Sequence, residues 1–115
     1  MYSYHGWLFT HETISIPDVR LTLENLNRQY PVSISHVNGS VHISFSGNPN
    51  RDLGELEKVI DYLVGLKKYM TGCVYINDAN SNRALEFDVV KIVNDRVTRI
   101  NDKNFSRDET FEVFK

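Results

Sequence analysis

Hydrophobic and polar residues alternate most regularly over residues 32–46, on both sides of an Asn38–Gly39 pair. Such a pair between two alternating runs predicts a β-hairpin with a two-residue type I′ turn. In that register Ile34 lies opposite Ile43, and the apolar side chains share one face. A shift of one residue would bury the polar set instead, so the pattern determines the register. The polar, solvated face carries Ser33, Ser35, Ser40, His42, Ser44 and Ser46.

Two other segments have the 3.6-residue spacing of amphipathic helices. The first covers residues 17–29, begins after the capping residue Ser15 and stops before Pro31. The second begins at a capping site near Asp52 and is ended by Gly72. Two cations, Lys67 and Lys68, are expected in its last turn, where the helix dipole favours positive charge.

Four further segments favour strands because they are rich in aromatic and β-branched residues. They are residues 2–10, 73–77, 85–93 and 96–100, with a turn at Asn94–Asp95 between the last two. Gly6 within the first segment indicates a bulge or a close backbone approach. The element order β-α-β-β-α-β-β-β predicts an α+β fold, an antiparallel or mixed sheet with two helices on one face.

Composition places the chain among ordinary globular proteins. It has 115 residues, 41% of them hydrophobic, and a formal net charge of -2. We expect a single domain over residues 1–115. The weak negative charge argues against strong non-specific binding to nucleic acid or anionic membrane. The N-terminus does not have the pattern of a signal peptide, and no later segment suits a membrane span, so we expect a cytoplasmic protein.

The sequence gives only weak evidence for catalytic groups. Cys73, the single cysteine, lies in an apolar run and is expected to be a buried thiol that takes no part in disulfide formation or nucleophilic chemistry. Glu86 and Asp88 would lie about 7 Å apart on one strand face, a separation that suits an acid–base pair but is more often a solvated face. We therefore expect no enzyme activity, no catalytic residue and no cofactor.

A metal site is not expected either, although the chain has four histidines. In the predicted hairpin His36 lies opposite Val41, on the other face from His42, so these two rings cannot bind one ion. No cysteine pair or helical His-x-x-x-His spacing supports the remaining two, His5 and His11.

The element order also suits a small ferredoxin-like module that binds RNA or a small ligand, and this is the alternative function. Such a module would expose aromatic and basic residues on its third strand. Here that strand exposes serines and His42, without a stacking surface. Acidic residues concentrate in the last third of the chain, where they could face a basic partner, but interspersed Lys and Arg weaken a single-sign patch.

Three short segments, in this order, resemble the immunity protein 7 family, bacterial antidotes encoded beside polymorphic or contact-dependent growth-inhibition toxins. They are Tyr-Ser-Tyr-His-Gly-Trp at residues 2–7, which includes His5, Gly6 and Trp7, then residues 72–78, and residues 87–90 followed by Asn94, Asp95, Asp102 and Ser106. Two positions depart from the family pattern: Asp95 where glycine is frequent, and Arg107 where proline is expected.

The resemblance implies an antidote that binds its cognate toxin domain, often a nuclease, and occludes its active site without catalysis. A nuclease is commonly basic near its active site, so we expect a toxin-contact surface formed by the loop after residue 77 and by nearby acids. Its residues are Asp78, Asn80, Arg83, Asp88, Asp102 and Asp108. Trp7 and His5 carry the resemblance and could contact the toxin, but packing in the core is the stronger expectation, because a strand tryptophan beside two amphipathic helices is more often buried than in contact with a partner.

Overall fold

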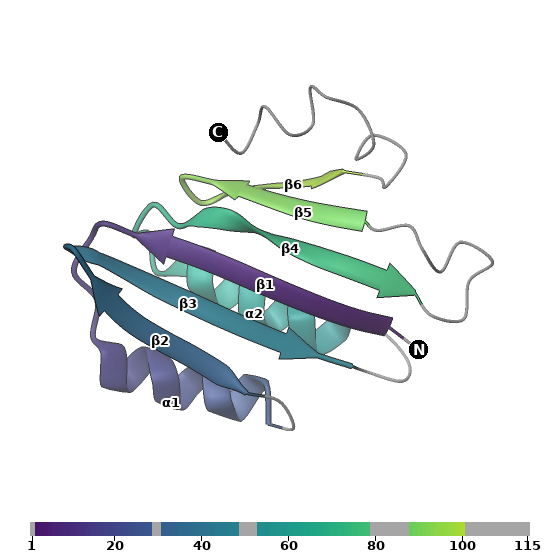
Figure 1. The fold of residues 1–115 in the computed structure, drawn as a ribbon, viewed down its shortest axis with the longest axis horizontal. Coiled ribbons are helices and arrows are strands. Elements are labelled where there is room, and N and C mark those ends of the chain that lie inside the picture. Colours follow the sequence, from purple (N-terminus) through teal and green to yellow (C-terminus); the bar gives the residue numbers. More distant parts are fainter. Residues whose placement is uncertain (1, 29–30, 49–52, 79–87, 101–115) are drawn as a thin grey trace.

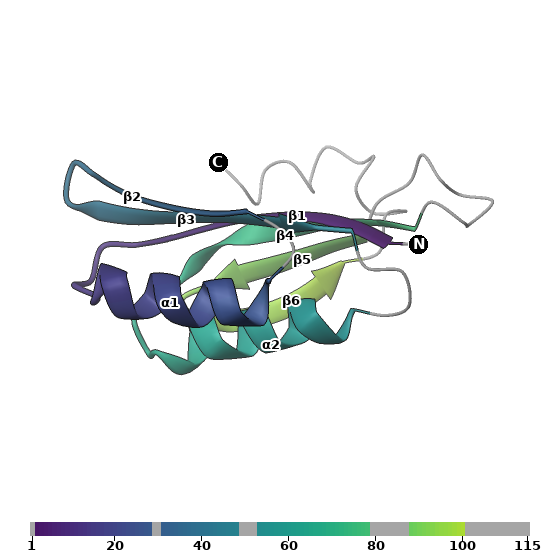
Figure 2. The same cartoon turned by 90° about the horizontal axis from the view of Figure 1, so that it is seen from below.

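The computed structural model describes residues 2–28, 31–48, 53–78 and 88–100. Its strands form one sheet in the order β2-β3-β1-β4-β5-β6, and every neighbouring pair is antiparallel (Figure 1). Both helices lie on the same side of this sheet (Figure 2). The elements are β1 (Tyr2–Thr10), α1 (Ile16–Leu26), β2 (Val32–Val37), β3 (Ser40–Gly47), α2 (Gly54–Gly65), β4 (Thr71–Asp78), β5 (Asp88–Val93) and β6 (Arg96–Ile100). The α+β class and the element order are confirmed.

Both predicted two-residue turns are present. In the β2–β3 hairpin Ile34 lies opposite Ile43, and Asn38 and Gly39 have φ of 51° and 81°. Asn94 and Asp95 join β5 to β6 with φ of 49° and 68°. A type I′ turn requires positive φ at both central residues, so each turn matches its sequence.

The Asp95 side chain adds contacts beyond its turn. Its two carboxylate oxygens accept hydrogen bonds from the backbone N–H groups of Tyr69 and Met70, at 2.9 and 2.8 Å. Its own N–H donates to the Met70 carbonyl. A glycine here would adopt the positive φ more easily but could not tie the β5–β6 turn to the segment before β4.

The central strand β1 pairs with β3 on one side and β4 on the other. Pairing continues through Gly6 on both sides, so this residue does not form a bulge. It provides the close approach instead, since a Cβ there would lie 2.5 Å from two ring atoms of Phe45.

The start of α1 differs in detail from the prediction. Ser15 is its N-cap residue, but its hydroxyl donates to the Asp18 carboxylate at 2.8 Å and accepts no hydrogen bond from the N–H groups of the first helical turn. The helix ends at Leu26, before the predicted end at residue 29. Directly after it, the N–H of Asn27 donates to the Leu23 carbonyl.

The predicted end of α2 is wrong. The helix stops at Gly65, so Lys67 and Lys68 lie beyond its last turn. Lys67 has φ of 58° and Tyr69 of 57°, and such left-handed residues end a helix. Gly72 does not end the helix but lies within β4, opposite Leu8 of β1.

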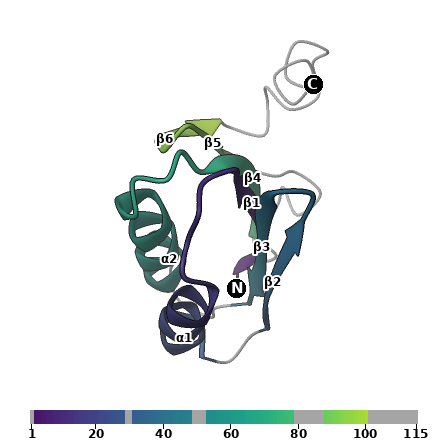
Figure 3. The ribbon, with the colours of Figure 1, turned by 90° about the vertical axis from the view of Figure 1, so that its left-hand side faces the viewer.

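The core lies between the helices and one face of the sheet (Figure 3). Its fully buried side chains include Leu8, Leu23, Ile43, Leu56, Leu63, Met70, Val74 and Ile92. Val19 and Leu23 contribute from α1, as the helical spacing predicts. Within the described part of the chain, no helix combines the length and apolar character needed to span a membrane.

Candidate functional site

The helices leave one face of the sheet open, and we call it the open face. Because side chains alternate along a strand, Tyr4, Gly6 and Leu8 of β1 face the helices while the residues between them face the other way. The described strand positions at its centre are His5, Trp7 and Phe9 of β1, His42 and Ser44 of β3, Thr71, Cys73 and Tyr75 of β4, Lys91 and Val93 of β5, and Arg96 and Thr98 of β6.

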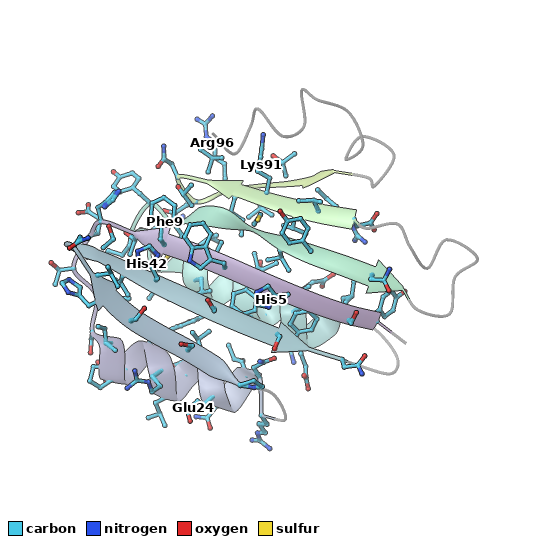
Figure 4. All side chains as sticks on the ribbon, viewed as in Figure 1. His5, Phe9, Glu24, His42, Lys91 and Arg96 are labelled. Carbon is cyan, nitrogen blue, oxygen red and sulfur yellow. The ribbon has the colours of Figure 1, made fainter. Side chains whose placement is uncertain are left out.

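Trp7, Phe9 and His42 form an aromatic cluster on this face (Figure 4 labels Phe9 and His42). The centroids of the Trp7 and Phe9 rings are 5.2 Å apart. The His42 ring lies 5.7 Å from Trp7 and 5.9 Å from Phe9, within 26° of parallel to each. The three rings pack against one another, yet 39% of Trp7 stays exposed.

A shallow cavity of about 540 Å³ adjoins the aromatic cluster. Its wall is largely apolar, and Lys91 supplies its cation. The lining residues are His5, Trp7, Phe9, Thr71, Gly72, Cys73, Tyr75, Lys91, Ile92 and Val93. A pocket of this size that is lined by aromatic and aliphatic groups suits an apolar side chain or a small ligand.

Cys73 lies on the open face and is half-buried, so the expectation of a thiol inside the core is wrong. Burial raises its pKa despite a hydrogen bond from the Tyr75 hydroxyl. Burial, followed by the contact with Cys73, raises the pKa of Tyr75 to about 12. Both groups are therefore neutral near pH 7, and a neutral thiol is a weak nucleophile.

The histidines are arranged as the hairpin register predicts. His36 pairs with Val41 and His42 with Ser35, so the two rings lie on opposite faces of the sheet. The Nδ1 atom of His11 is hydrogen-bonded to the Ser40 hydroxyl at 2.7 Å. Among the residues with described positions, no three His, Cys, Asp or Glu side chains are grouped as metal ligands.

Most of the predicted toxin-contact residues lie outside the described residues: Asn80, Arg83, Asp102 and Asp108. The same holds for Glu86, the partner proposed for Asp88 in an acid–base pair. Asp78 is the last residue of β4. Asp88 lies opposite Ile76, on the helix side of the sheet, and its carboxylate is 2.7 Å from the Arg99 guanidinium. The structure therefore separates Asp88 from the aromatic cluster.

The prediction that Trp7 packs in the core is wrong. The third strand, β3, presents serines and His42 as predicted, but the His42 ring stacks on Trp7 and Phe9 of β1, so an aromatic surface forms across the two strands. His5 and Trp7 point away from the helices, because they alternate along β1 with the buried residues Tyr4, Gly6 and Leu8. The aromatic groups come mainly from β1, with His42 alone from β3. In the sequence, Gly6 indicates which face of β1 is buried, because a residue without a side chain suits the crowded face toward the helices. Its neighbour Trp7 then lies on the open face.

Comparisons with known proteins agree with the resemblance read from the sequence. No curated protein and no solved structure matches the chain. The model of immunity protein 7 matches residues 1–108, which is nearly the whole chain. The chain therefore belongs to the immunity protein 7 family.

Proposed function

We propose that this protein binds and neutralises a cognate toxin domain of a polymorphic or contact-dependent growth-inhibition system. The family match over residues 1–108 carries the proposal. The open face supports it, because exposed tryptophan, tyrosine and arginine side chains are the usual energetic anchors of protein–protein contacts. The protein acts as a single domain in the cytoplasm, where an incoming toxin would otherwise reach its target.

Inhibition without catalysis fits the chemistry of the described residues. The single cysteine is held neutral, and Asp88 is paired with Arg99. A protein with this surface can act by covering a partner's active site, which requires affinity and shape but no reacting group.

A nuclease is the toxin class that we propose. Its active site must attract phosphate and is commonly basic, so acids on the inhibitor would accelerate association. The proposed contact residues remain Asp78, Asn80, Arg83, Asp88, Asp102 and Asp108. We expect Asp88 to contribute least, because Arg99 already compensates much of its charge.

Co-expression with the product of the adjacent upstream gene tests this function. We expect that product to arrest growth alone and to be harmless beside this protein. A harmless product, or growth arrest that persists despite co-expression, would contradict the assignment. Nuclease assays on the purified toxin domain then decide its class.

Reversing Asp78, Asp88 and Asp102 together to Lys should slow association with the toxin domain about fivefold at low salt, with little effect at high salt. Stopped-flow kinetics at two ionic strengths measures this change. The matched control reverses three helix acids, Asp18, Glu57 and Asp61, and should alter the rate less. Equal effects of the two triple variants would exclude a specific acidic contact.

Binding of RNA or a small ligand is the second candidate function. The aromatic cluster favours this candidate, with Lys91 in the adjoining cavity and Arg96 farther along the same face on β6, because stacked rings and cations hold single-stranded nucleic acid. Titration with a short single-stranded RNA, without any protein partner, tests it. Saturable binding would support this function.

A further inference from the structure

We propose that the open face is the toxin-docking surface, and that its cavity receives an apolar side chain of the toxin beside a toxin carboxylate. The inference rests on the proposed function and names the surface and the chemistry of the partner. It differs from the proposed contact through acidic residues, which affects association. Slow dissociation of the complex is assigned here to Trp7, Phe9, Tyr75 and Lys91.

The fold does not require the rings of Trp7 and Phe9 at the surface. The buried side of β1 is complete without them: Tyr4 and Leu8 fill the core, and Gly6 leaves room for Phe45. Several other exposed hydrophobic side chains lie at scattered places, such as Leu21 on α1 and Tyr69 before β4. Trp7, by contrast, lies against Phe9 and His42 at the edge of an apolar cavity. Such clustering typifies an interaction surface.

The apolar patch around Trp7 has the size of an interface centre. Three strand spacings separate β3 from β5, about 14 Å, and His5 and Phe9 lie about 13 Å apart along β1. The patch thus covers roughly 200 Å², against about 800 Å² for each partner of a stable complex. It has the size of a central anchor and not of a whole interface.

The surroundings of the patch match the usual design of an interface. Next to the aromatic cluster, four serines of β2 and β3 carry their hydroxyl groups on the same face: Ser33, Ser35, Ser44 and Ser46. Protein interfaces combine an apolar centre with a polar rim that stays hydrated in the free protein. We therefore place the toxin over β3, β1, β4 and β5.

Charge identifies what the toxin presents there. Among the described strand positions on the open face no residue is acidic, and Lys91 and Arg96 provide the charge. The helices on the other side carry the five acids Asp18, Glu24, Glu55, Glu57 and Asp61 against two bases, Arg20 and Lys58. A toxin carboxylate would be repelled by the helices and attracted by Lys91 and Arg96, so the segment that docks on the open face should carry a carboxylate.

Dissociation kinetics tests this assignment with the toxin domain encoded by the adjacent gene as the probe. Trp7→Ala should accelerate dissociation about 30-fold or more, with association changed less than about twofold, because buried apolar contacts act mainly on dissociation. Trp7→Phe should reverse most of this acceleration and dissociate at close to the native rate. Lys91→Glu should accelerate dissociation about fivefold by removing the partner of the toxin carboxylate.

Two variants on the helix side are matched controls. Leu21→Ala removes an exposed hydrophobic side chain from α1, and Lys58→Glu makes the same charge change on α2. Both should leave dissociation within about twofold of the native rate. Trp7 is the only tryptophan of the chain, so the fluorine resonance of incorporated 5-fluorotryptophan reports on this position alone. It should shift when the toxin domain is added.

The outcomes separate the two proposals. If the native chain binds and protects, but Trp7→Ala and Lys91→Glu dissociate like the controls and the fluorine resonance does not move, the docking surface is wrong and the immunity function stands. If the native chain neither binds nor protects, the proposed function itself fails. Trp7-dependent binding of single-stranded RNA, or Trp7-dependent dimerisation in sedimentation, with toxin dissociation unaltered, would likewise overturn the docking surface.

Discussion

Replacing Gly72 by Ala should destabilise the fold by about 3 kcal/mol or more. Gly72 lies in β4 directly opposite Leu8, and a Cβ added there would project into β1. It would overlap the backbone carbonyl oxygen of Trp7 and come within 2.8 Å of the Leu8 Cα atom. Backbone atoms of a paired strand cannot move aside as a flexible side chain can, so pairing between β1 and β4 must be disturbed.

Urea unfolding of the purified variant measures this loss of stability. Gly65→Ala is the matched control, because Gly65 closes α2 and a Cβ there meets no atom within 4 Å. That substitution should be neutral or slightly stabilising, since alanine is the better helix former by up to about 1 kcal/mol. Equal stabilities for the two variants would show that Gly72 is not needed for close strand approach.

Replacing Asn27 by Ala should cost about 2–4 kcal/mol, because it removes two hydrogen bonds from a buried polar bridge. Only 1% of Asn27 is exposed. Its Oδ1 accepts from the Tyr4 hydroxyl at 2.6 Å, and its Nδ2 donates to the Ser46 carbonyl at 3.0 Å. This side chain therefore joins the end of α1 to both β1 and β3.

Thermal or urea unfolding checks the prediction, with Asn25→Ala as the control on the exposed side of α1. That variant should stay within about 0.5 kcal/mol of the native protein. A double-mutant cycle with Tyr4→Phe should give a coupling of about 1 kcal/mol between the two side chains. Additive effects of Tyr4→Phe and Asn27→Ala would mean that the hydrogen bond between them contributes nothing to stability.

The features that could be predicted are those that neighbouring residues determine. The β2–β3 register follows from alternation around Asn38–Gly39, and the β5–β6 turn from two residues that tolerate positive φ. Both helices follow from their apolar spacing, although α2 ends early. The end of α2 depends on left-handed backbone at Lys67 and Tyr69. Lysine and tyrosine rarely adopt this conformation, so the sequence does not predict it there.

The sequence predicts little of the candidate site, and the reason differs from the one that applies to the end of α2. Alternation identifies which residues share a face of β1, but Tyr4 and Leu8 are about as apolar as Trp7 and Phe9. Hydrophobicity alone therefore did not choose the buried set. The acids were the more visible feature of the sequence, yet Asp88 is paired with Arg99 on the other side of the sheet.

The element order, the two turns, the hairpin register and the family follow from the amino-acid sequence alone, because each depends on local spacing or on the order of short segments. Which face of the sheet the helices cover becomes visible in the folded chain alone. That choice depends on packing across elements distant in sequence: the Phe45 ring needs the space at Gly6, and Asn27 needs both Tyr4 and Ser46. Once these contacts form, Trp7, Phe9 and His42 are left on the opposite face, where a partner can reach them.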